Sequence, residues 1–259
     1  MTDYLTELFG LQGKIAVLTG AGGYLISEMS AAFAKAGVKV ALLDVDLASA
    51  EKVAAKIRAE GNKAVALKVD VTQKLELERA LDEIIKKYGD LDILVSGAGI
   101  NASTPFLEIT LDEWNRILEV QLTGTMLACQ VFGAYMVTQN KGVIVNISSA
   151  SAGPPLSKAF AYSVAKAGVQ NLTQNLAREW ATSGVRVNAL RPGFFPTEWS
   201  KKNFLTADRV QAILNHTPMR RFGEPRELVG TVLWLCSEAA SFVTGAEIAV
   251  DGGFSAMTI

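Results

Sequence analysis

The chain has few of the residues that build metal sites or cross-linked scaffolds. Its 259 residues include two cysteines, Cys129 and Cys236, and a single histidine, His216. Two cysteines far apart in an ordinary-sized chain supply neither a disulfide framework nor a metal-ligand cluster, and a lone histidine has no partner for a catalytic triad. We therefore expect no resident metal, and we predict a reducing, cytoplasmic environment.

An excess of charge of one sign is also missing. Lys and Arg number 25 against 26 Asp and Glu, for a net charge of −1, so no positive field is present to attract nucleic acid or anionic lipid. The start, MTDYLTELFG, lacks the basic beginning and apolar centre of a secretory signal. The apolar runs stop well short of the roughly 18 residues that a membrane span requires. We expect a soluble protein with no nucleic-acid and no membrane partner.

What the sequence does contain is a regular alternation of two patterns. Short β-branched runs predict strands at 14–19, 39–44, 64–70, 92–97, 142–148, 185–190 and 247–250. Segments of helical period predict helices at 26–36, 47–60, 74–88, 111–138, 157–181 and 225–236. Strands this apolar are buried on both faces, as parallel strands are when helices cover each side. The sequence predicts an α/β fold, a single Rossmann-type domain over residues 1–259. We expect a doubly wound parallel sheet of about seven strands with helices on both faces.

Such sheets bind ligands at the carboxyl ends of their strands, near the switch in strand order. The one long stretch without a regular pattern, 191–209, is predicted to be an irregular functional loop, with a substrate loop at about 194–216.

The stretch TGAGGYLI, residues 19–26, joins the first predicted strand to a helix. Backbone N–H groups in such a turn, together with the positive end of the helix, can receive a pyrophosphate. Asp44 ends the second strand, and a carboxylate there accepts ribose hydroxyls and repels a 2′-phosphate. The pattern favours NAD over NADP. The alternative is that the glycines only satisfy turn geometry, and Asp70 is equally well a helix cap or an adenine contact.

A second group of residues carries the chemistry. Tyr162 and Lys166 are four residues apart in a predicted helix, which places them on one face. An ammonium beside a phenol lowers the pKa of the phenol and makes it a usable acid or base. Ser149 ends a strand, where its hydroxyl can hold a substrate oxygen. Tyr-x-x-x-Lys alone is more often structural, but beside the glycine turn and Asp44 it indicates a hydride-transfer site.

From about Leu11 to Gly253 the chain resembles the short-chain dehydrogenase/reductases. The matching segments are TGAGG, LLD at 42–44, VDV at 69–71, GAG at 97–99, NISS at 146–149, YSVAK at 162–166, RPG at 191–193 with Thr197, and VDGG at 250–253. The resemblance implies that Ser149 orients the substrate carbonyl or alcohol and that Tyr162 is the acid/base. It implies that Lys166 holds the nicotinamide ribose and lowers the pKa of the tyrosine.

Together with the glycine turn, the resemblance also implies a cofactor site. The expected cofactor-binding residues are Gly20, Gly22, Gly23, Tyr24, Leu25, Asp44, Asp70, Val71, Ala98, Gly99, Tyr162, Lys166, Pro192, Gly193, Phe195 and Thr197. The last four form a loop that positions the nicotinamide carboxamide in this family.

The sequence departs from the family pattern at several of these places. Where the family motif T-G-x-x-x-G-x-G has its last two glycines, this chain has Tyr24 and Ile26. Where the family has a second motif, N-N-A-G, this chain has Ser96-Gly97-Ala98-Gly99. We expect Gly22 and Gly23 to carry the bend while the N–H groups of Tyr24 and Leu25 face the pyrophosphate.

The asparagine of the family's proton relay is replaced by Gln121, which we expect to hold a relay water in a shifted place. Because of these departures, the alternative interpretation remains that the chain is a nucleotide-binding protein with weak or no catalysis. The intact set of Ser149, Tyr162 and Lys166 argues against that alternative.

The loop sequences predict the class of substrate and the residues that contact it. The chain most resembles the family members that interconvert D-fructuronate and D-mannonate, followed by gluconate 5-dehydrogenases; another polyol or ketone is the alternative. The expected substrate residues are Asn101, Ser149, Ser151, Tyr162, Phe194, Trp199 and Lys202. Four cations either pair with a substrate carboxylate or form a solvated face: Lys201, Lys202, Arg220 and Arg221.

The resemblance also implies a homotetramer, because helices 111–138 and 157–181 correspond to the family's usual dimer interface.

Overall fold

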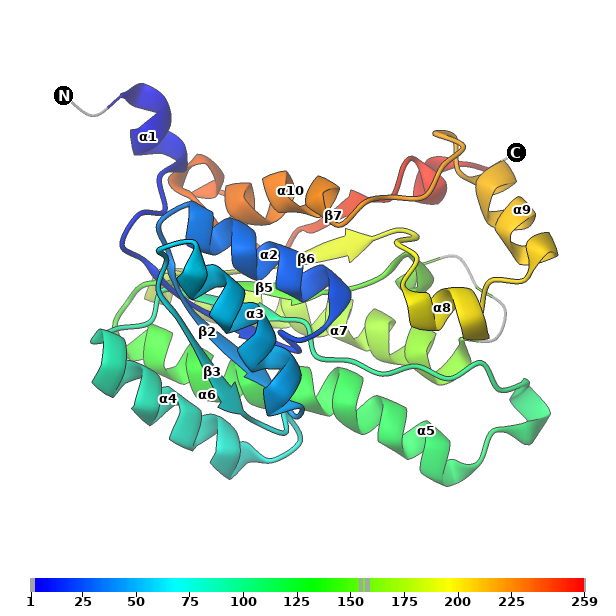
Figure 1. The fold of residues 1–259 in the computed structure, drawn as a ribbon, viewed down its shortest axis with the longest axis horizontal. Helices are drawn as coiled ribbons and strands as arrows, with labels where there is room; N and C mark the ends of the chain where they lie inside the picture. The colour runs from blue at the N-terminus through cyan, green and yellow to red at the C-terminus, as the bar shows by residue number, and fades with distance from the viewer. Residues whose placement is uncertain (1–2, 154–155, 157–158, 259) are drawn as a thin grey trace.

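The computed structural model describes residues 3–153, 156 and 159–258. Its centre is a seven-stranded parallel sheet in the order β3-β2-β1-β4-β5-β6-β7 (Figure 1). The strands are β1 (Ile15–Thr19), β2 (Lys39–Asp44), β3 (Ala64–Lys68), β4 (Ile93–Ser96), β5 (Gly142–Ile147), β6 (Val185–Pro192) and β7 (Glu247–Val250). The expected doubly wound parallel sheet is confirmed, and each predicted strand lies within two residues of its observed ends.

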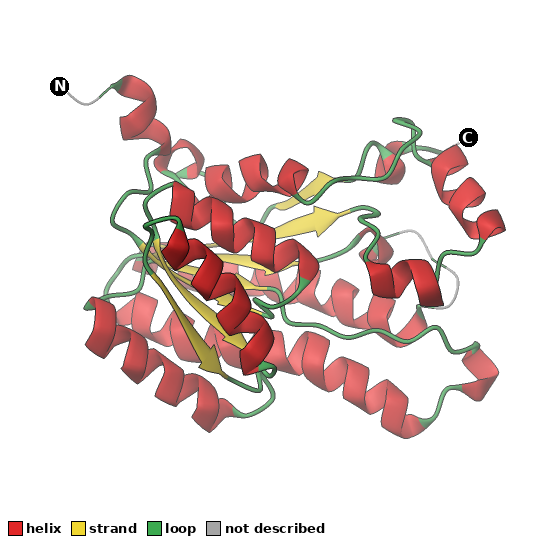
Figure 2. Cartoon of the chain, viewed as in Figure 1, coloured by secondary structure: helices red, strands yellow, loops and turns green. Residues whose placement is uncertain are grey.

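The helices that connect these strands lie on both faces of the sheet (Figure 2). They are α2 (Tyr24–Lys35), α3 (Leu47–Ala59), α4 (Lys74–Tyr88), α5 (Leu111–Leu118), α6 (Gly124–Thr138), α7 (Phe160–Trp180) and α10 (Arg226–Cys236). A short α1 (Tyr4–Phe9) precedes β1. Since the chain moves outward from β1 to β3 and then returns to β4 beside β1, the switch in strand order lies between β1 and β4.

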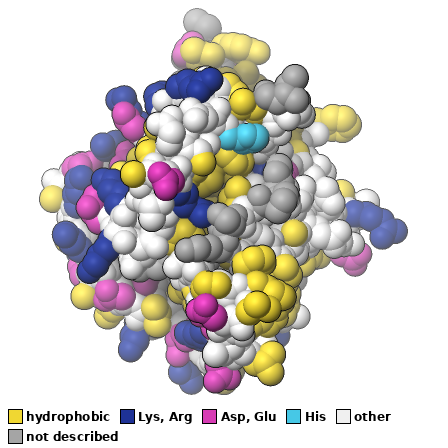
Figure 3. All heavy atoms as spheres, turned by 90° about the vertical axis from the view of Figure 1, so that its right-hand side faces the viewer, with side chains coloured by type: hydrophobic (Ala, Val, Ile, Leu, Met, Phe, Trp, Pro, Cys, Tyr) yellow, Lys and Arg dark blue, Asp and Glu magenta, His cyan; other side chains and the backbone are white. Residues whose placement is uncertain are grey.

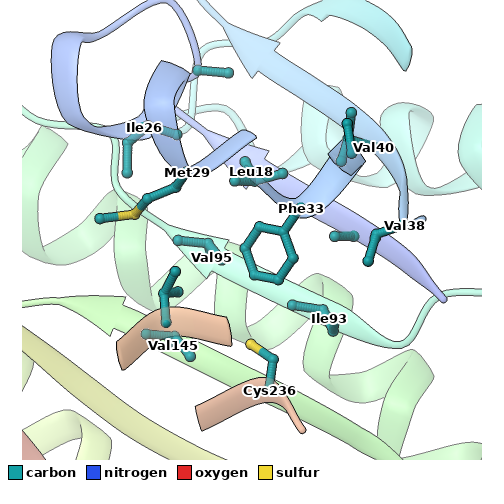
Figure 4. Close-up of a cluster of buried hydrophobic side chains, with 14 of the residues drawn as sticks. Leu18, Ile26, Met29, Phe33, Val38, Val40, Ile93, Val95, Val145 and Cys236 are labelled. Carbon is teal, nitrogen blue, oxygen red and sulfur yellow. The ribbon is translucent and has the colours of Figure 1, made fainter. Parts of the chain in front are cut away.

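Two hydrophobic cores sandwich the sheet. Successive residues of β1 point to opposite cores: Leu18 joins the core under α2, α3 and α10, and Val17 joins the core under α4, α6 and α7. Figure 4 shows part of the first core, where Met29 and Phe33 of α2 lie over the sheet. Strands buried on both faces explain why the sequence showed apolar runs without polar alternation.

One predicted helix is a composite. α5 continues through a π-helical segment, η2 (Glu119–Thr123), into α6, so that 28 residues, Leu111–Thr138, are helical without a break. Within the described part of the chain this helix is long and apolar enough to cross a membrane, but 56% of its apolar window is buried inside the structure. It is a core helix of the fold.

The prediction of an irregular 191–209 stretch is wrong in part. β6 extends to Pro192, α8 (Glu198–Asn203) follows, and α9 (Ala207–His216) begins before the stretch ends. The helix starts are set by threonine caps that a hydropathy pattern does not show: Thr197 and Thr206 accept hydrogen bonds from N–H groups of the first turns. The segment is therefore a pair of short helices projecting beyond the sheet (Figure 1).

Candidate active site

A cavity of about 730 Å³ lies at the carboxyl ends of the strands. Residues at or after the ends of six strands line it, among them Gly20, Asp44, Asp70, Gly97, Ser149 and Gly193. Its outer wall includes residues of α8 and α9. Figure 3 shows the molecule from that side, with apolar side chains gathered near the centre of the view. The cavity sits where a doubly wound sheet places its ligand.

The glycine turn makes one wall of this cavity. Gly20 has φ +70°, and a Cβ there would lie 2.7 Å from the Cα of Ala98, so a side chain is excluded. Gly23 is the N-cap of α2 and offers no side chain to cap it. The first-turn residues Tyr24, Leu25 and Ile26 all line the cavity, and their N–H groups precede the first intrahelical bond, from Ser27 N to Gly23 O. The turn therefore presents a helix N-terminus to the cavity without a competing cap.

Gly22 has a different position from its neighbours. Its N–H donates to Asp44 Oδ2 at 2.9 Å, and it does not line the cavity. A Cβ on Gly22 would lie 2.6 Å from the Cβ of Ser49. This glycine lets α3 approach the turn and fixes the Asp44 carboxylate, which itself faces the cavity.

Ile26 replaces a family glycine, and the structure shows what accommodates it. Ile26 is 4% exposed and belongs to the core under α2 (Figure 4). A Cβ built on Gly97 would lie 2.3 Å from Ile26 Cδ1 and 2.7 Å from Ile26 Cγ1. Since the family pattern has asparagine where Gly97 stands, the two departures are complementary: the space given up by residue 97 is filled by residue 26.

Ser149 and Tyr162 lie together in the wall of the cavity. Ser149 follows β5 and caps the 3-10 turn η3 (Ala150–Ala152), accepting from Ser151 N at 3.2 Å and Ser151 Oγ at 3.1 Å. Tyr162 is half-buried in the first turn of α7 and shares a hydrogen bond with the Ser149 side chain. Both side chains line the cavity.

Lys166 lies one turn further along α7. It is 4% exposed, its Nζ lies 5.6 Å from the Tyr162 ring centroid, and it donates to Ile147 O at 2.6 Å. Burial lowers the pKa of Lys166 to about 7. Burial also raises the pKa of Tyr162, while the Ser149 hydrogen bond acts in the opposite direction. The loss of hydration around the phenol is the larger of these two effects, so the net shift is upward. That Lys166 lowers the pKa of Tyr162 stays a prediction.

Gln121 sits in the π-helical segment η2. It is 2% exposed, and its Nε2 donates to Ile100 O at 2.6 Å. Its Oε1 is buried and has no hydrogen-bond partner among the described residues. A Cβ on Gly99 would lie 2.6 Å from this amide, so Gly99 leaves the room that the longer side chain needs. π-helical turns often occur at functional sites. Gln121 lines the cavity, and its buried Oε1 has capacity to accept a hydrogen bond.

The loop after β6 closes the cavity on the side of α8. Gly193, Phe195 and Thr197 line it, whereas Pro192 is a buried residue of β6 that does not. The hydroxyl of Thr197 accepts from Ser200 N at 3.0 Å in a capping box that begins α8. That hydroxyl can still donate its own hydrogen toward the cavity.

The remaining expected cofactor residues also reach the cavity. Val71, Ala98 and Gly99 line it. Asp70 lines it as well, and its Oδ1 accepts from Thr72 N at 2.9 Å and Thr72 Oγ1 at 2.8 Å. The structure thus shows Asp70 stabilising a turn and facing the cavity at once.

The expected substrate residues are divided. Asn101, Ser151 and Phe194 line the cavity beside Ser149 and Tyr162, whereas Lys202 does not. Trp199 belongs to α8, and its side chain lies outside the described part of the structure.

The other cations proposed from the sequence have local partners. Lys201 pairs with Glu198, Arg220 donates to Asn215, and Arg221 forms two hydrogen bonds with Glu227. His216 packs edge-on against Phe254. The solvated-face interpretation accounts for these cations.

The sequence analysis missed two cations of the cavity wall, Arg116 in α5 and Arg209 in α9. No sequence motif marked either, because both lie on helices whose orientation only the fold determines. Over the described residues, no group of three or more His, Cys, Asp or Glu side chains is placed to hold a metal ion.

The residues fit a nicotinamide dinucleotide. The cavity runs from Asp44 and Val45 at the end of β2, past the uncapped N-terminus of α2, to the loop after β6. A side chain at Gly20 or Gly193 would collide with neighbouring backbone, since the built Cβ atoms lie 2.7 Å from Ala98 Cα and 2.6 Å from Asp251 Cα. Such close backbone approaches beside a helix N-terminus are what a pyrophosphate requires.

Comparison with known proteins agrees with this geometry. A family model described as Enoyl-(Acyl carrier protein) reductase matches residues 27–255. Galactitol 2-dehydrogenase (L-tagatose-forming) from Cereibacter sphaeroides is 38% identical over 257 residues, covering 98% of this chain and 99% of the relative.

Two solved structures are similar over nearly the whole chain. A gluconate 5-dehydrogenase from Burkholderia cenocepacia J2315, in complex with NADP and tartrate, superposes with a TM-score of 0.94 at 30% identity and covers 98% of this chain and 100% of that one. A protein from Haemophilus influenza with bound NAD, described as a "putative D-Mannonate oxidoreductase", gives a TM-score of 0.90 at 34% identity over 96% and 97% of the two chains.

Proposed function

Because the chain belongs to the short-chain dehydrogenase/reductases, oxidoreductases that act on CH–OH groups, we propose that it interconverts a secondary alcohol and a ketone of a sugar acid, with NAD as cofactor. D-Mannonate and D-fructuronate are the proposed pair. The coarser assignment, a sugar or polyol oxidoreductase, is common to the similar proteins.

One observation carries the chemistry: Ser149, Tyr162 and Lys166 meet in a single cavity with the glycine turn. A bound nicotinamide cofactor supplies or accepts the hydride at the substrate carbon. The Ser149 hydroxyl donates a hydrogen bond to the substrate oxygen and holds it beside the Tyr162 hydroxyl, with which it already interacts.

In the reducing direction, Tyr162 gives its proton to that oxygen as the carbon becomes tetrahedral, which leaves a phenolate. The Lys166 ammonium, 5.6 Å from the ring centroid, stabilises the phenolate. Lys166 has donors left for the cofactor ribose besides the hydrogen it gives to Ile147. Gln121 Oε1 accepts a hydrogen bond from a relay water, and this water passes a proton from bulk solvent to the Tyr162 phenolate.

NAD is the proposed cofactor because Asp44 carries its carboxylate at the end of β2 against the cavity. A 2′-phosphate placed there meets a negative charge that hydrogen bonds from Gly22 and Asp46 hold in position, each at 2.9 Å. One similar structure holds NAD and another NADP, so the preference of this chain rests on Asp44.

The test is a panel of sugar acids and polyols assayed with NADH and NADPH, or with their oxidised forms. We expect reduction of D-fructuronate and oxidation of D-mannonate, with NADH preferred. Turnover of polyols such as galactitol, with no turnover of any hexuronate or hexonate, rejects the sugar-acid proposal in favour of the second candidate, which the galactitol 2-dehydrogenase relative supports.

Replacing Tyr162 by phenylalanine tests the acid/base role. The ring stays in the first turn of α7 and the exchangeable proton is lost, so we expect kcat to fall by a factor of about 10² to 10⁴. NADH binding, followed by fluorescence, should persist because the glycine turn is unaltered. Unchanged turnover rejects the role of Tyr162. No activity in the wild type, with normal NADH binding, favours the nucleotide-binding protein without efficient catalysis.

A further inference from the structure

We propose that Ser151 is a positioning residue of the active site, which makes the Ser149 hydroxyl a dedicated hydrogen-bond donor. This inference rests on the proposed function, since it concerns how Ser149 holds the oxygen of the reacting alcohol or ketone, but it does not depend on which sugar is the substrate. Ser151 belongs to η3, is 3% exposed and lines the same cavity as Ser149.

Two hydrogen bonds join the two serines. The backbone N–H of Ser151 donates to Ser149 Oγ at 3.2 Å, and the Ser151 hydroxyl donates to the same oxygen at 3.1 Å. A serine hydroxyl has two acceptor lone pairs and one hydrogen. Both lone pairs of the Ser149 oxygen are therefore occupied, and what the side chain has left to offer is its own hydrogen.

The direction of the bond between the two hydroxyls follows from a third group, Tyr162. Burial raises the pKa of Tyr162, and the hydrogen bond of Ser149 acts against burial, as a donor to the phenol oxygen does. Since the single hydrogen of Ser149 points to Tyr162, the hydrogen between the two serines comes from Ser151. The donors therefore run in one direction, from Ser151 through Ser149 to Tyr162.

The backbone around the two serines holds this geometry. Ser149 is the N-cap of η3, and Ala152 N donates to Ser149 O at 2.9 Å to close the turn. On the other side, Ser148 N donates to Leu190 O of β6 at 2.8 Å. The turn thus keeps the two side chains within hydrogen-bonding distance of each other.

This arrangement separates the roles of Ser149 and Tyr162. An oxygen whose lone pairs are both occupied is a poor acceptor, so in the oxidising direction the substrate hydroxyl gives its proton to the Tyr162 phenolate alone. In the reducing direction, Ser149 donates to the carbonyl oxygen and stabilises the negative charge that this oxygen gains. Hydrogen bonds in a chain polarise one another, so the Ser151 hydroxyl strengthens the donation by Ser149.

The first test compares two small substitutions, assayed on the alcohol and ketone that the substrate panel identifies. Ser151→Ala removes the hydroxyl donor and keeps the backbone N–H, so we expect kcat to fall by about three- to tenfold, with KM within about twofold of the wild type. Ser151→Cys keeps the approximate size of the side chain but carries only a weak S–H donor, so its kcat should fall nearly as far. A wild-type kcat in Ser151→Cys shows that Ser151 only packs, and rejects the inference.

The second test is a double-variant cycle with Ser149→Ala. If Ser151 acts through Ser149, adding Ser151→Ala to the Ser149→Ala enzyme should change kcat by less than about twofold. The pH profile of alcohol oxidation gives a further readout. Weaker donation to the phenolate raises the pKa of Tyr162, so the acid limb of kcat/KM should move to higher pH in Ser151→Ala.

Ser237→Ala is the matched control. Ser237 is also buried, at 1% exposed, and its hydroxyl donates to Trp234 O at 2.8 Å, but it does not line the cavity. This variant should leave kcat, KM and the acid limb unchanged. The melting temperature of each variant separates a loss of stability from a loss of positioning.

Failure of the inference is distinguishable from failure of the proposed function. If the wild type is active and Ser151→Ala raises KM with kcat unchanged, lowers kcat equally with and without the Ser149 hydroxyl, or changes neither constant, the positioning role is rejected and the proposed function stands. If the wild type binds NADH but turns over no alcohol or ketone in the panel, the proposed function fails, and the role of Ser151 fails with it.

Discussion

At the scale of single residues, burial shifts the pKa values of groups in the candidate active site. Lys166 is the plainest case, because its ammonium is almost completely buried and its described hydrogen bond is to one backbone carbonyl, Ile147 O. Burial lowers the pKa of Lys166 to about 7. The protonated form of Lys166 is therefore favoured only when a bound cofactor or the Tyr162 phenolate stabilises the ammonium. Its titration therefore links catalysis to folding.

The pH dependence of folding follows from that pKa. Lys166 titrates near pH 7 in the folded protein, against 10.5 for the unfolded chain. Between these values the unfolded state binds more protons, so the contribution of Lys166 to stability rises with pH across this window. Below about pH 7 Lys166 is protonated in both states, so the folded protein bears the full free-energy cost of burying the ammonium.

We therefore predict a pH-dependent difference between wild type and Lys166→Met. Without nucleotide, the melting temperature of the wild type should rise relative to that of the variant as the pH increases from 6.5 to 10, and the difference should level off beyond the unfolded pKa. Thermal melts of both proteins in the same buffers measure it, because all other titrating groups are shared. A difference that is constant across this range contradicts the lowered pKa.

At the scale of elements, the contact between α2 and the end of β4 decides whether the unusual glycine turn can form. Gly97 lies outside the positive-φ region, so an alanine can adopt its backbone. The main obstacle is the side chain of Ile26, and Ile147 Cγ1 would lie 3.3 Å from the new Cβ. We predict that Gly97→Ala destabilises the protein by roughly 1 to 3 kcal/mol through overpacking. Ile26→Ala, which opens a void, should cost about 2 to 4 kcal/mol.

The double variant should be less destabilised than the sum of the two, since the new methyl group enters the space that Ile26 leaves. Chemical denaturation of all four proteins measures the coupling. Gly230→Ala in α10 is the control: nothing lies within 4 Å of a Cβ there, so it should be neutral or stabilising by up to about 1 kcal/mol. Strictly additive effects at 26 and 97 contradict the complementary packing.

A largely buried ion pair connects β6 and β7 behind Ser149, the candidate active-site serine. Arg191 and Glu247 lie 3.0 Å apart with side chains 13% and 10% exposed. Glu247 also accepts from Ser148 Oγ at 2.5 Å, and Arg191 donates to Ala150 O at 3.4 Å. The pair therefore holds both residues that flank Ser149.

We predict that Glu247→Gln destabilises the protein by about 3 kcal/mol or more, because the Arg191 charge then lies buried without its counter-charge. The kcat should fall as well, as the Ser149 turn loses its support. The double variant Arg191→Leu with Glu247→Leu should recover most of the stability without recovering kcat. Denaturation and steady-state assays separate the two effects, and recovery of both would show that the pair has no positioning role.

At the scale of the whole molecule, exposed apolar side chains lie on α5 and α7. Leu111 is 78% exposed, Val164 50% and Phe160 40%. Large apolar groups gathered on neighbouring elements indicate an interface, and α5 and α7 are in contact with each other in the fold. This supports the proposed homotetramer.

Light scattering should therefore give a mass four times the 27.7 kDa of the chain. Val164→Glu places a charge in the apolar surface and should reduce the assembly to a smaller species, whereas Lys52→Glu on the exposed side of α3 should not. A monomeric wild type contradicts the proposal.

How far the sequence predicted this molecule also depends on scale. The sheet followed from apolar runs alone, because burial on both faces leaves a strong pattern. Tyr162 and Lys166 followed from their spacing on one helix, and Ser149 from its place at a strand end. Arg209, the caps of α8 and α9, and the Arg191–Glu247 pair did not, since each depends on segments that come together only in the folded chain.

The reciprocal fit of Ile26 and Gly97 also restricts the order in which such a pair can arise. Starting from a small residue at 26 and a larger one at 97, shrinking residue 97 first leaves an empty space, which a fold tolerates at modest expense. Enlarging residue 26 first drives atoms to within 2.3 Å of one another. Each mutational route to this turn therefore passes through a destabilised intermediate, one with an empty space and the other with overlapping atoms.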